Sequence, residues 1–191
     1  MKWVAMLGAL SCLFLGGLSS QAQQKLEGEN LLLAPPAGFK MAFRGSRDDV
    51  GIFEWVPNGE TLEDWTEMMT VQVFKDRPDL DPKDFLAKIQ TRWQAECNGS
   101  ASAPVTAERI NGYTAATMLL RCPLLPSTGK PEMTMFRAIK GKDALYLVQR
   151  AVRAADTPEQ VARLEAYFAK VSACDVRSPA HPCPDLVPHR R

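Results

Sequence analysis

Two proline-led helix starts divide this chain into blocks of strand-like sequence, and they constrain its fold more than any other feature. The first is Asp81-Pro82, followed by apolar residues at three- and four-residue spacing as far as Cys97. The second is Thr157-Pro158-Glu159-Gln160, in which Gln160 completes a capping box. Proline suits the first helical turn because backbone N–H groups there have no partner within the helix, so the N–H group that proline lacks costs no hydrogen bond. The sequence therefore predicts one helix in the middle of the chain and one near its end.

The segments around these helices alternate apolar and polar residues, which is the pattern of half-buried strands. Turn sequences join neighbouring strands at Ser46–Asp49, Asn111-Gly112 and Gly141–Asp143. The expected strands are 39–44, 50–56, 65–74, 105–110, 113–122, 133–140 and 144–152. The order β-β-β-α-β-β-β-β-α predicts an α+β fold, with a largely antiparallel sheet of about six to seven strands covered by two amphipathic helices.

The first 22 residues have the pattern of a cleavable export signal. Lys2 is followed by an apolar stretch, Val4–Leu18, that is shorter than a membrane-spanning helix. Ser20-Gln21-Ala22 places small residues at the −3 and −1 positions, so we expect cleavage between Ala22 and Gln23. The signal therefore predicts a periplasmic or secreted protein, and we expect no transmembrane segment in the mature chain.

The remaining chain has the length of one domain. We expect a lead-in at 23–36 that ends in two prolines, a single α+β domain at 37–176, and a proline-rich C-terminal tail at 177–191. The whole chain has 23 basic and 22 acidic residues, and Lys2 is the only charged residue of the signal. The mature chain is therefore neutral, and it lacks the basic surface expected of a nucleic-acid-binding protein.

Four cysteines follow the signal, an even number that indicates two disulfides in an oxidising compartment. Of the three possible pairings, we favour the one that is local in sequence, Cys97–Cys122 with Cys174–Cys183. Cys174, His181 and Cys183 are an alternative metal site, but their spacing is not that of a zinc site. Oxidised cysteines would not serve as nucleophiles, and both histidines, His181 and His189, lie in the tail.

Several short segments resemble a family of small, secreted, uncharacterised bacterial proteins. They are Gly112-Tyr113 with Leu120–Pro123, Phe136–Tyr146 and Ala169–Asp175. The element order is similar to the PsbP-type α/β/α sandwich, and the resemblance extends over about Pro36 to Pro184. It implies no reaction and no catalytic residues. PsbP-like domains are mostly accessory or binding proteins, which favours a non-enzyme by analogy.

The leading functional hypothesis is a non-enzymatic exported domain that binds a protein or envelope component, with no cofactor. A hydrolase that uses carboxylates such as Glu54, Glu60 or Asp64 is the first alternative. Two carboxylates converging in a cleft would favour it, whereas a flat apolar patch or an exposed sheet edge would favour the binding protein.

A metal-handling protein is the second alternative, because thioethers bind Cu(I). The methionines concerned are Met68, Met69, Met118, Met133 and Met135. Methionine on an alternating strand is more often flexible core filler. Trp55 and Trp65 flank the loop at 57–64, where they form either an aromatic ligand-binding edge or part of the core and its rim.

Overall fold

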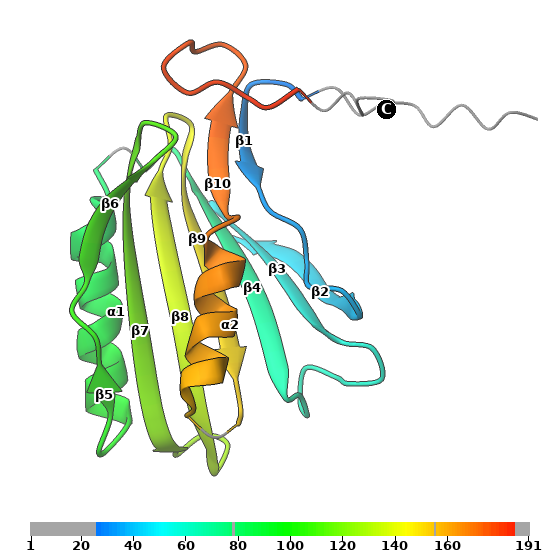
Figure 1. The fold of residues 1–191 in the computed structure, drawn as a ribbon, viewed down its shortest axis with the longest axis vertical. Helices are drawn as coiled ribbons and strands as arrows, with labels where there is room; N and C mark the ends of the chain where they lie inside the picture. Colours follow the sequence, from blue (N-terminus) through cyan, green and yellow to red (C-terminus); the bar gives the residue numbers. More distant parts are fainter. Residues whose placement is uncertain (1–25, 78, 155, 186–191) are drawn as a thin grey trace, which may run out of the picture.

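The computed structural model describes residues 26–77, 79–154 and 156–185 (Figure 1). The expected export signal and the Ala22–Gln23 cleavage site lie outside these ranges. The elements in chain order are β1 (Glu29–Leu32), β2 (Phe39–Arg47), β3 (Val50–Pro57), β4 (Glu67–Lys75), α1 (Pro82–Glu96), β5 (Ala101–Ser102), β6 (Thr106–Ile110), β7 (Tyr113–Leu125), β8 (Lys130–Lys140), β9 (Ala144–Val152), α2 (Pro158–Phe168) and β10 (Ser172–Asp175).

The large sheet has eight strands in the order β2-β3-β4-β9-β8-β7-β5, with β6 also paired to β7. All of its pairs are antiparallel, which confirms the expected α+β class. The seven strands expected from the sequence all belong to this sheet. The eighth, β5, is two residues long and is too short for a periodic pattern to indicate.

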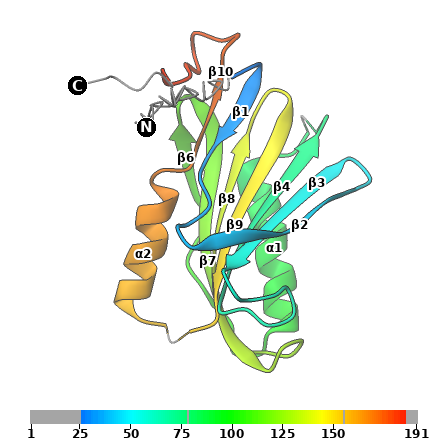
Figure 2. The ribbon, with the colours of Figure 1, turned by 90° about the vertical axis from the view of Figure 1, so that its right-hand side faces the viewer.

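The two helices cover opposite faces of the large sheet (Figure 2). Neighbouring residues of β9 show this, because successive strand side chains point to opposite faces. Tyr146 and Val148 belong to the core cluster that contains Leu164 and other residues of α2. Leu145 and Leu147 belong to a second cluster built around Leu86 of α1. Strand β9 is therefore buried on both sides, which explains its nearly continuous apolar sequence.

Both helix starts have the N-cap residues that the sequence predicts, but the Gln160 side chain accepts hydrogen bonds from Arg163 and does not complete the expected capping box. The Asp81 carboxylate accepts hydrogen bonds from the backbone N–H groups of Lys83 and Asp84. The Thr157 hydroxyl accepts one from Gln160. Helix α2 ends at Phe168, one turn earlier than the expected stripe, which extends to Val171.

The expected lead-in contributes a strand of its own. Strand β1 pairs with β10 in a separate two-stranded sheet, from Glu29 opposite Asp175 to Leu32 opposite Ser172. Leu31 and Leu33 of this segment pack against the core cluster on the α2 face. The two four-residue strands carry no periodic signal, and they form because the ends of the domain meet in space (Figure 1).

Candidate functional site

The carboxylates of the hydrolase hypothesis belong to separate local networks. Glu54 of β3 accepts a hydrogen bond from the Thr70 hydroxyl at 3.5 Å, and burial raises the pKa of Glu54 above its usual value. Glu60 accepts hydrogen bonds from the backbone N–H and the hydroxyl of Thr66, each at 2.7 Å. Both oxygens of Glu60 therefore hold the loop that leads into β4.

Asp64, the third candidate, forms an exposed ion pair with Lys130 at 2.8 Å. The Lys130 ammonium lowers the pKa of this carboxyl, the opposite of what a general acid needs. Within the described ranges, no hydrogen bond or ion pair joins any two of Glu54, Glu60 and Asp64. Each of the three candidate carboxylates therefore has a structural partner of its own.

The two tryptophans lie on opposite faces of the sheet. Trp55 stacks on Phe53 with a centroid separation of 6.3 Å and packs against the α2-face cluster. Trp65 is 7% exposed and packs with Val56 and Ala151. Trp55 and Val56 are neighbours in β3, so their side chains point to opposite faces. The structure therefore does not bring the tryptophans together as a ligand-binding edge.

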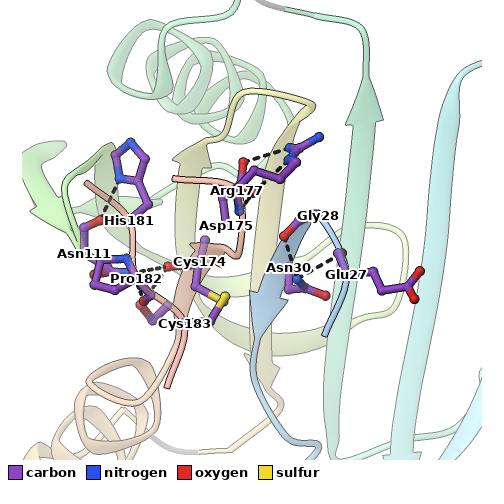
Figure 3. Close-up of a disulfide and its surroundings, with 12 residues drawn as sticks. Glu27, Gly28, Asn30, Asn111, Cys174, Asp175, Arg177, His181, Pro182 and Cys183 are labelled. Atoms are coloured by element: carbon purple, nitrogen blue, oxygen red, sulfur yellow. Dashed lines mark hydrogen bonds and ion pairs between the residues drawn. A yellow bond between two sulfur atoms is a disulfide. The ribbon is translucent and has the colours of Figure 1, made fainter. Parts of the chain in front are cut away.

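The structure contains the disulfides Cys97–Cys122 and Cys174–Cys183, the two sequence-local pairs. The first joins the end of α1 to β7, and the second joins β10 to the segment after it (Figure 3). Within the described ranges, no group of three or more His, Cys, Asp or Glu residues is placed to hold a metal ion. His189 lies outside those ranges.

The candidate methionines are mostly core residues. Met69, Met118, Met133 and Met135 are each at most 4% exposed. The Tyr167 hydroxyl donates a hydrogen bond to the Met69 sulfur at 2.7 Å. These thioethers fill the spaces on both faces of the sheet, which is the structural role typical of methionine.

The segment after β10 folds back onto the Asn111-Gly112 turn (Figure 3). The His181 ring stacks on Tyr113 at 3.8 Å, and its Nδ1 lies 2.9 Å from the Asn111 carbonyl oxygen. The Asn111 side chain donates to the Pro182 carbonyl at 2.9 Å. Asn111 and Gly112 have φ values of 46° and 82°, as the tight hairpin predicts. The hairpin turn therefore also binds the segment after β10, a contact that the sequence did not indicate.

An ion pair between Asp175 and Arg177 lies in the same region. The Arg177 guanidinium donates to both oxygens of Asp175 at 2.8 Å (Figure 3). It also donates to the Asp143 carboxylate at 2.6 Å. The hydrogen bonds from Arg177 lower the pKa of Asp175 to about 2. A carboxyl with a lowered pKa stabilises the folded state only while it is ionised.

We therefore expect acid to weaken the fold partly through Asp175. Its contribution is complete above the unfolded pKa of 3.8 and is lost as the pH falls toward 2. In urea denaturation between about pH 5 and about pH 2, the midpoint of the wild-type protein should fall more steeply than that of Asp175→Asn. Equal slopes for the two proteins would contradict this role.

One edge of the large sheet carries exposed apolar side chains. The described part of the chain has four exposed large apolar residues, Met41, Phe43, Leu124 and Val176. Met41 is 48% and Phe43 41% exposed, and both belong to β2, the terminal strand of the sheet. A pocket of about 380 Å³ lies beside them, lined by residues 40–42 and 60–63. We call this region, 40–43 with 60–63, the β2 edge surface.

A β-bulge shapes the β2 edge surface. Met41 pairs with Trp55 and Phe43 pairs with Glu54, while Ala42 is the extra residue between them. Because Glu54 and Trp55 point to opposite faces, Met41 and Phe43 do too. The alternation of Phe39, Met41 and Phe43 predicts a single buried face, and this expectation is wrong for Met41 and Phe43. No pattern in the sequence marks the bulge.

A second pocket, of about 410 Å³, lies near the Cys97–Cys122 disulfide. Its walls include Ala101, Pro123 and Met133, with an ion pair between Arg121 and Asp156 at 2.7 Å. The charges that line it therefore have a partner within the protein, and the exposed apolar side chains lie elsewhere. The β2 edge surface is the stronger candidate for binding.

No family model and no curated protein sequence matches this chain. Among solved structures, the Ran-binding protein Mog1p of Saccharomyces cerevisiae has a TM-score of 0.50 and 11% identity, covering 82% of this chain and all of that one. PsbP (CyanoP) of Synechocystis sp. PCC 6803 has a TM-score of 0.45 and 13% identity, covering 84% of this chain and 99% of that one.

A Pseudomonas aeruginosa protein of unknown function has a TM-score of 0.45 and 14% identity, covering 73% of this chain and 87% of its own. The likeness to Mog1p supports a fold of the Mog1 type. Membership of a secreted bacterial family stays a prediction. In the described part of the chain, no helix is long and apolar enough to cross a membrane.

Proposed function

We propose that this protein is an exported, non-enzymatic accessory protein that binds a protein or envelope component through the β2 edge surface. The exposure of Met41 and Phe43 on a terminal strand carries the proposal. An edge strand has unpaired backbone groups, and natural proteins usually protect such an edge from other chains. Large apolar side chains left exposed at that edge are typical of an interaction site.

Two further observations support a binding role. The candidate carboxylates Glu54, Glu60 and Asp64 each have a separate structural partner, which favours structural roles for them. Mog1p, which shares the fold, is a Ran-binding protein, so this type of fold is used for binding in at least one protein.

Two disulfides support the proposed exported location. Disulfides form and persist in the periplasm and outside the cell, where the environment is oxidising. Both cysteines of Cys97–Cys122 are buried, and so is Cys174 of the second disulfide. Each disulfide therefore crosslinks segments that already pack together in the fold. Detection of the processed protein in periplasmic or culture fractions, with Gln23 as its first residue, would test the location and the cleavage site together.

Site-specific photo-crosslinking tests the binding role. A photoreactive amino acid at Met41 or at Phe43 should capture the same partner from an envelope extract. The matched control is Leu124, which is 59% exposed but lies on β7, away from the β2 edge surface. Equal capture from all three positions, or capture from none, would contradict the proposal.

A further inference from the structure

The β2 strand is strongly basic. Lys40, Arg44 and Arg47 are all exposed, and the strand sequence from Phe39 to Arg47 contains no acidic residue. None of the three cations forms an ion pair with a described residue. The Arg44 guanidinium lies over the Phe53 ring at 5.6 Å, which leaves its charge without an anionic partner.

Four acids lie near these cations, Glu60 and Glu63 in the loop of the β2 edge surface and Asp48-Asp49 directly after Arg47. None of the four forms a described ion pair with Lys40, Arg44 or Arg47. In the loop of the β2 edge surface, Glu60 already accepts two hydrogen bonds from Thr66. Glu54 opposite Phe43 is half-buried and bonds to Thr70. A terminal strand with three free cations and two exposed apolar side chains is complementary to a strand that carries acids and apolar residues.

On the basis of the proposed binding function, we infer that the partner supplies an extended acidic segment that adds to the large sheet as a strand beside β2. Main-chain hydrogen bonds of the added strand would satisfy the free backbone edge. Its acidic side chains would lie opposite Lys40, Arg44 and Arg47, and its apolar ones would contact Met41 and Phe43. Each oppositely charged cross-strand pair contributes about 0.2 to 1 kcal/mol.

The bulge favours an added strand over an anionic membrane surface. Met41 and Phe43 point to opposite faces of the sheet. A flat lipid surface would cover one of the two, whereas a neighbouring strand presents side chains to both faces. An added strand also pairs with backbone N–H and C=O groups, which lipid tails cannot do.

The same charges disfavour a second copy of this chain as the occupant. Two β2 strands side by side would place three cations against three more. Like charges opposite each other on neighbouring strands are destabilising. Lysine and arginine on an edge strand are a common means of preventing self-association, and here they leave the edge open to an acidic partner.

Fluorescence anisotropy with labelled peptides of about ten residues tests the inference, since this length spans a typical strand. The probe repeats Glu-Glu-Val-Val, which places glutamate and valine on both faces of an added strand, because the cations and the apolar residues of β2 also lie on both faces. The controls replace glutamate with lysine or place proline at the centre. The acidic peptide should bind, and both controls should bind at least about tenfold more weakly. Raising the salt from about 50 to about 300 mM should weaken the binding, because salt screens exposed charges.

Charge reversal locates the binding site on the protein. The triple variant K40E/R44E/R47E should bind the acidic peptide about tenfold more weakly and should gain affinity for the lysine peptide. The matched control reverses three exposed cations of α1, K83E/K88E/R92E, which changes the net charge equally. This control should retain most of the affinity, and circular dichroism should show that both variants are folded.

The outcomes separate this inference from the proposed function. Equal loss in both triple variants, insensitivity to salt, or tight binding of the lysine peptide would overturn the acidic-strand inference, although crosslinking at Met41 would still support a binding surface. If co-sedimentation shows a higher affinity for phosphatidylglycerol vesicles than for the acidic peptide, the partner of the β2 edge is a membrane surface and not a strand. If the protein forms a dimer that K40E/R44E/R47E weakens or strengthens, a second copy of this chain pairs with β2 in place of an acidic strand. Absence of crosslinking at Met41 and Phe43 counts against the proposed function itself.

Discussion

Replacing Arg137 with alanine should lower the free energy of unfolding by about 3 to 5 kcal/mol, the usual cost of removing one partner of a buried ion pair. Arg137 lies on β8 and is 9% exposed. Its guanidinium donates hydrogen bonds to the carbonyl oxygens of Phe168 and Val171, where α2 ends. It also pairs with Glu108 of β6 at 3.1 Å. Alanine would remove the guanidinium donor from all three acceptors, leaving the Phe168 carbonyl with only the Val171 N–H and Glu108 with only the Thr117 hydroxyl.

Arg137 therefore stabilises the C-terminus of α2 from within the core. The last carbonyls of a helix have no partner inside the helix, so a cation placed there satisfies them and interacts favourably with the helix dipole. Burial lowers the pKa of Arg137, and the guanidinium still stays charged at neutral pH. Amide hydrogen exchange in Arg137→Ala should rise most in the last turn of α2 and in the turn before β10.

Arg109→Ala is the matched control, because it also removes an arginine that donates to a carbonyl. Arg109 lies on β6, next to Glu108 in the sequence, and its bond to Gly112 is exposed to solvent. Water can replace an exposed donor, so we expect a loss below about 1 kcal/mol. Urea denaturation measures both variants, and a similar small loss in each would show that Arg137 is not a structural anchor.

The second large effect is expected from the Cys97–Cys122 disulfide. Replacing both cysteines with alanine should lower the free energy of unfolding by about 3 to 4 kcal/mol, because the crosslink restricts the unfolded chain over 25 residues. The two cysteines are 1% and 2% exposed, so a reductant should act on the native protein only slowly. Reduction under denaturing conditions, followed by refolding in reductant, should cause a larger loss in the wild-type protein, because it removes the Cys174–Cys183 disulfide as well.

The Cys174–Cys183 disulfide provides the comparison. It spans nine residues, so on chain entropy alone its removal should cost about 1 kcal/mol less. Its loss should act locally, raising hydrogen exchange around His181 and the Asn111-Gly112 turn, which the closed segment covers. A larger loss for this pair than for Cys97–Cys122 would contradict the chain-entropy argument.

The elements that the sequence predicts well are those with local causes. Asp81-Pro82 and Thr157-Pro158 mark the helix starts because caps depend on residues within one turn. Asn111-Gly112 marks a hairpin because few residues tolerate its backbone angles. The strands that join these signals follow from alternation. The cysteine pairs follow from their separation in sequence and from an expected export.

The features that the sequence does not indicate depend on contacts between distant residues. Strands β1 and β10 form because the two ends of the domain meet, with Glu29 opposite Asp175. Trp55 and Trp65 look alike in sequence, but Trp55 of β3 packs on the α2 face and Trp65, from the loop before β4, packs on the opposite face. The candidate carboxylates are close in sequence, but each has a separate partner. No local pattern encodes any of these distances.

The sequence by itself determined the class of fold, the helix caps, the hairpins and the cysteines available for pairing, because all of these depend on neighbours along the chain. The tertiary structure decided that Arg137 holds the end of α2, that the segment after β10 docks on a hairpin turn, and that β2 is a free edge. The exposure of Met41 and Phe43 was decided by their position at the end of the sheet and by a bulge at Ala42. A strand's apolar pattern shows that its side chains need a partner, and only the assembled sheet shows whether this chain supplies it.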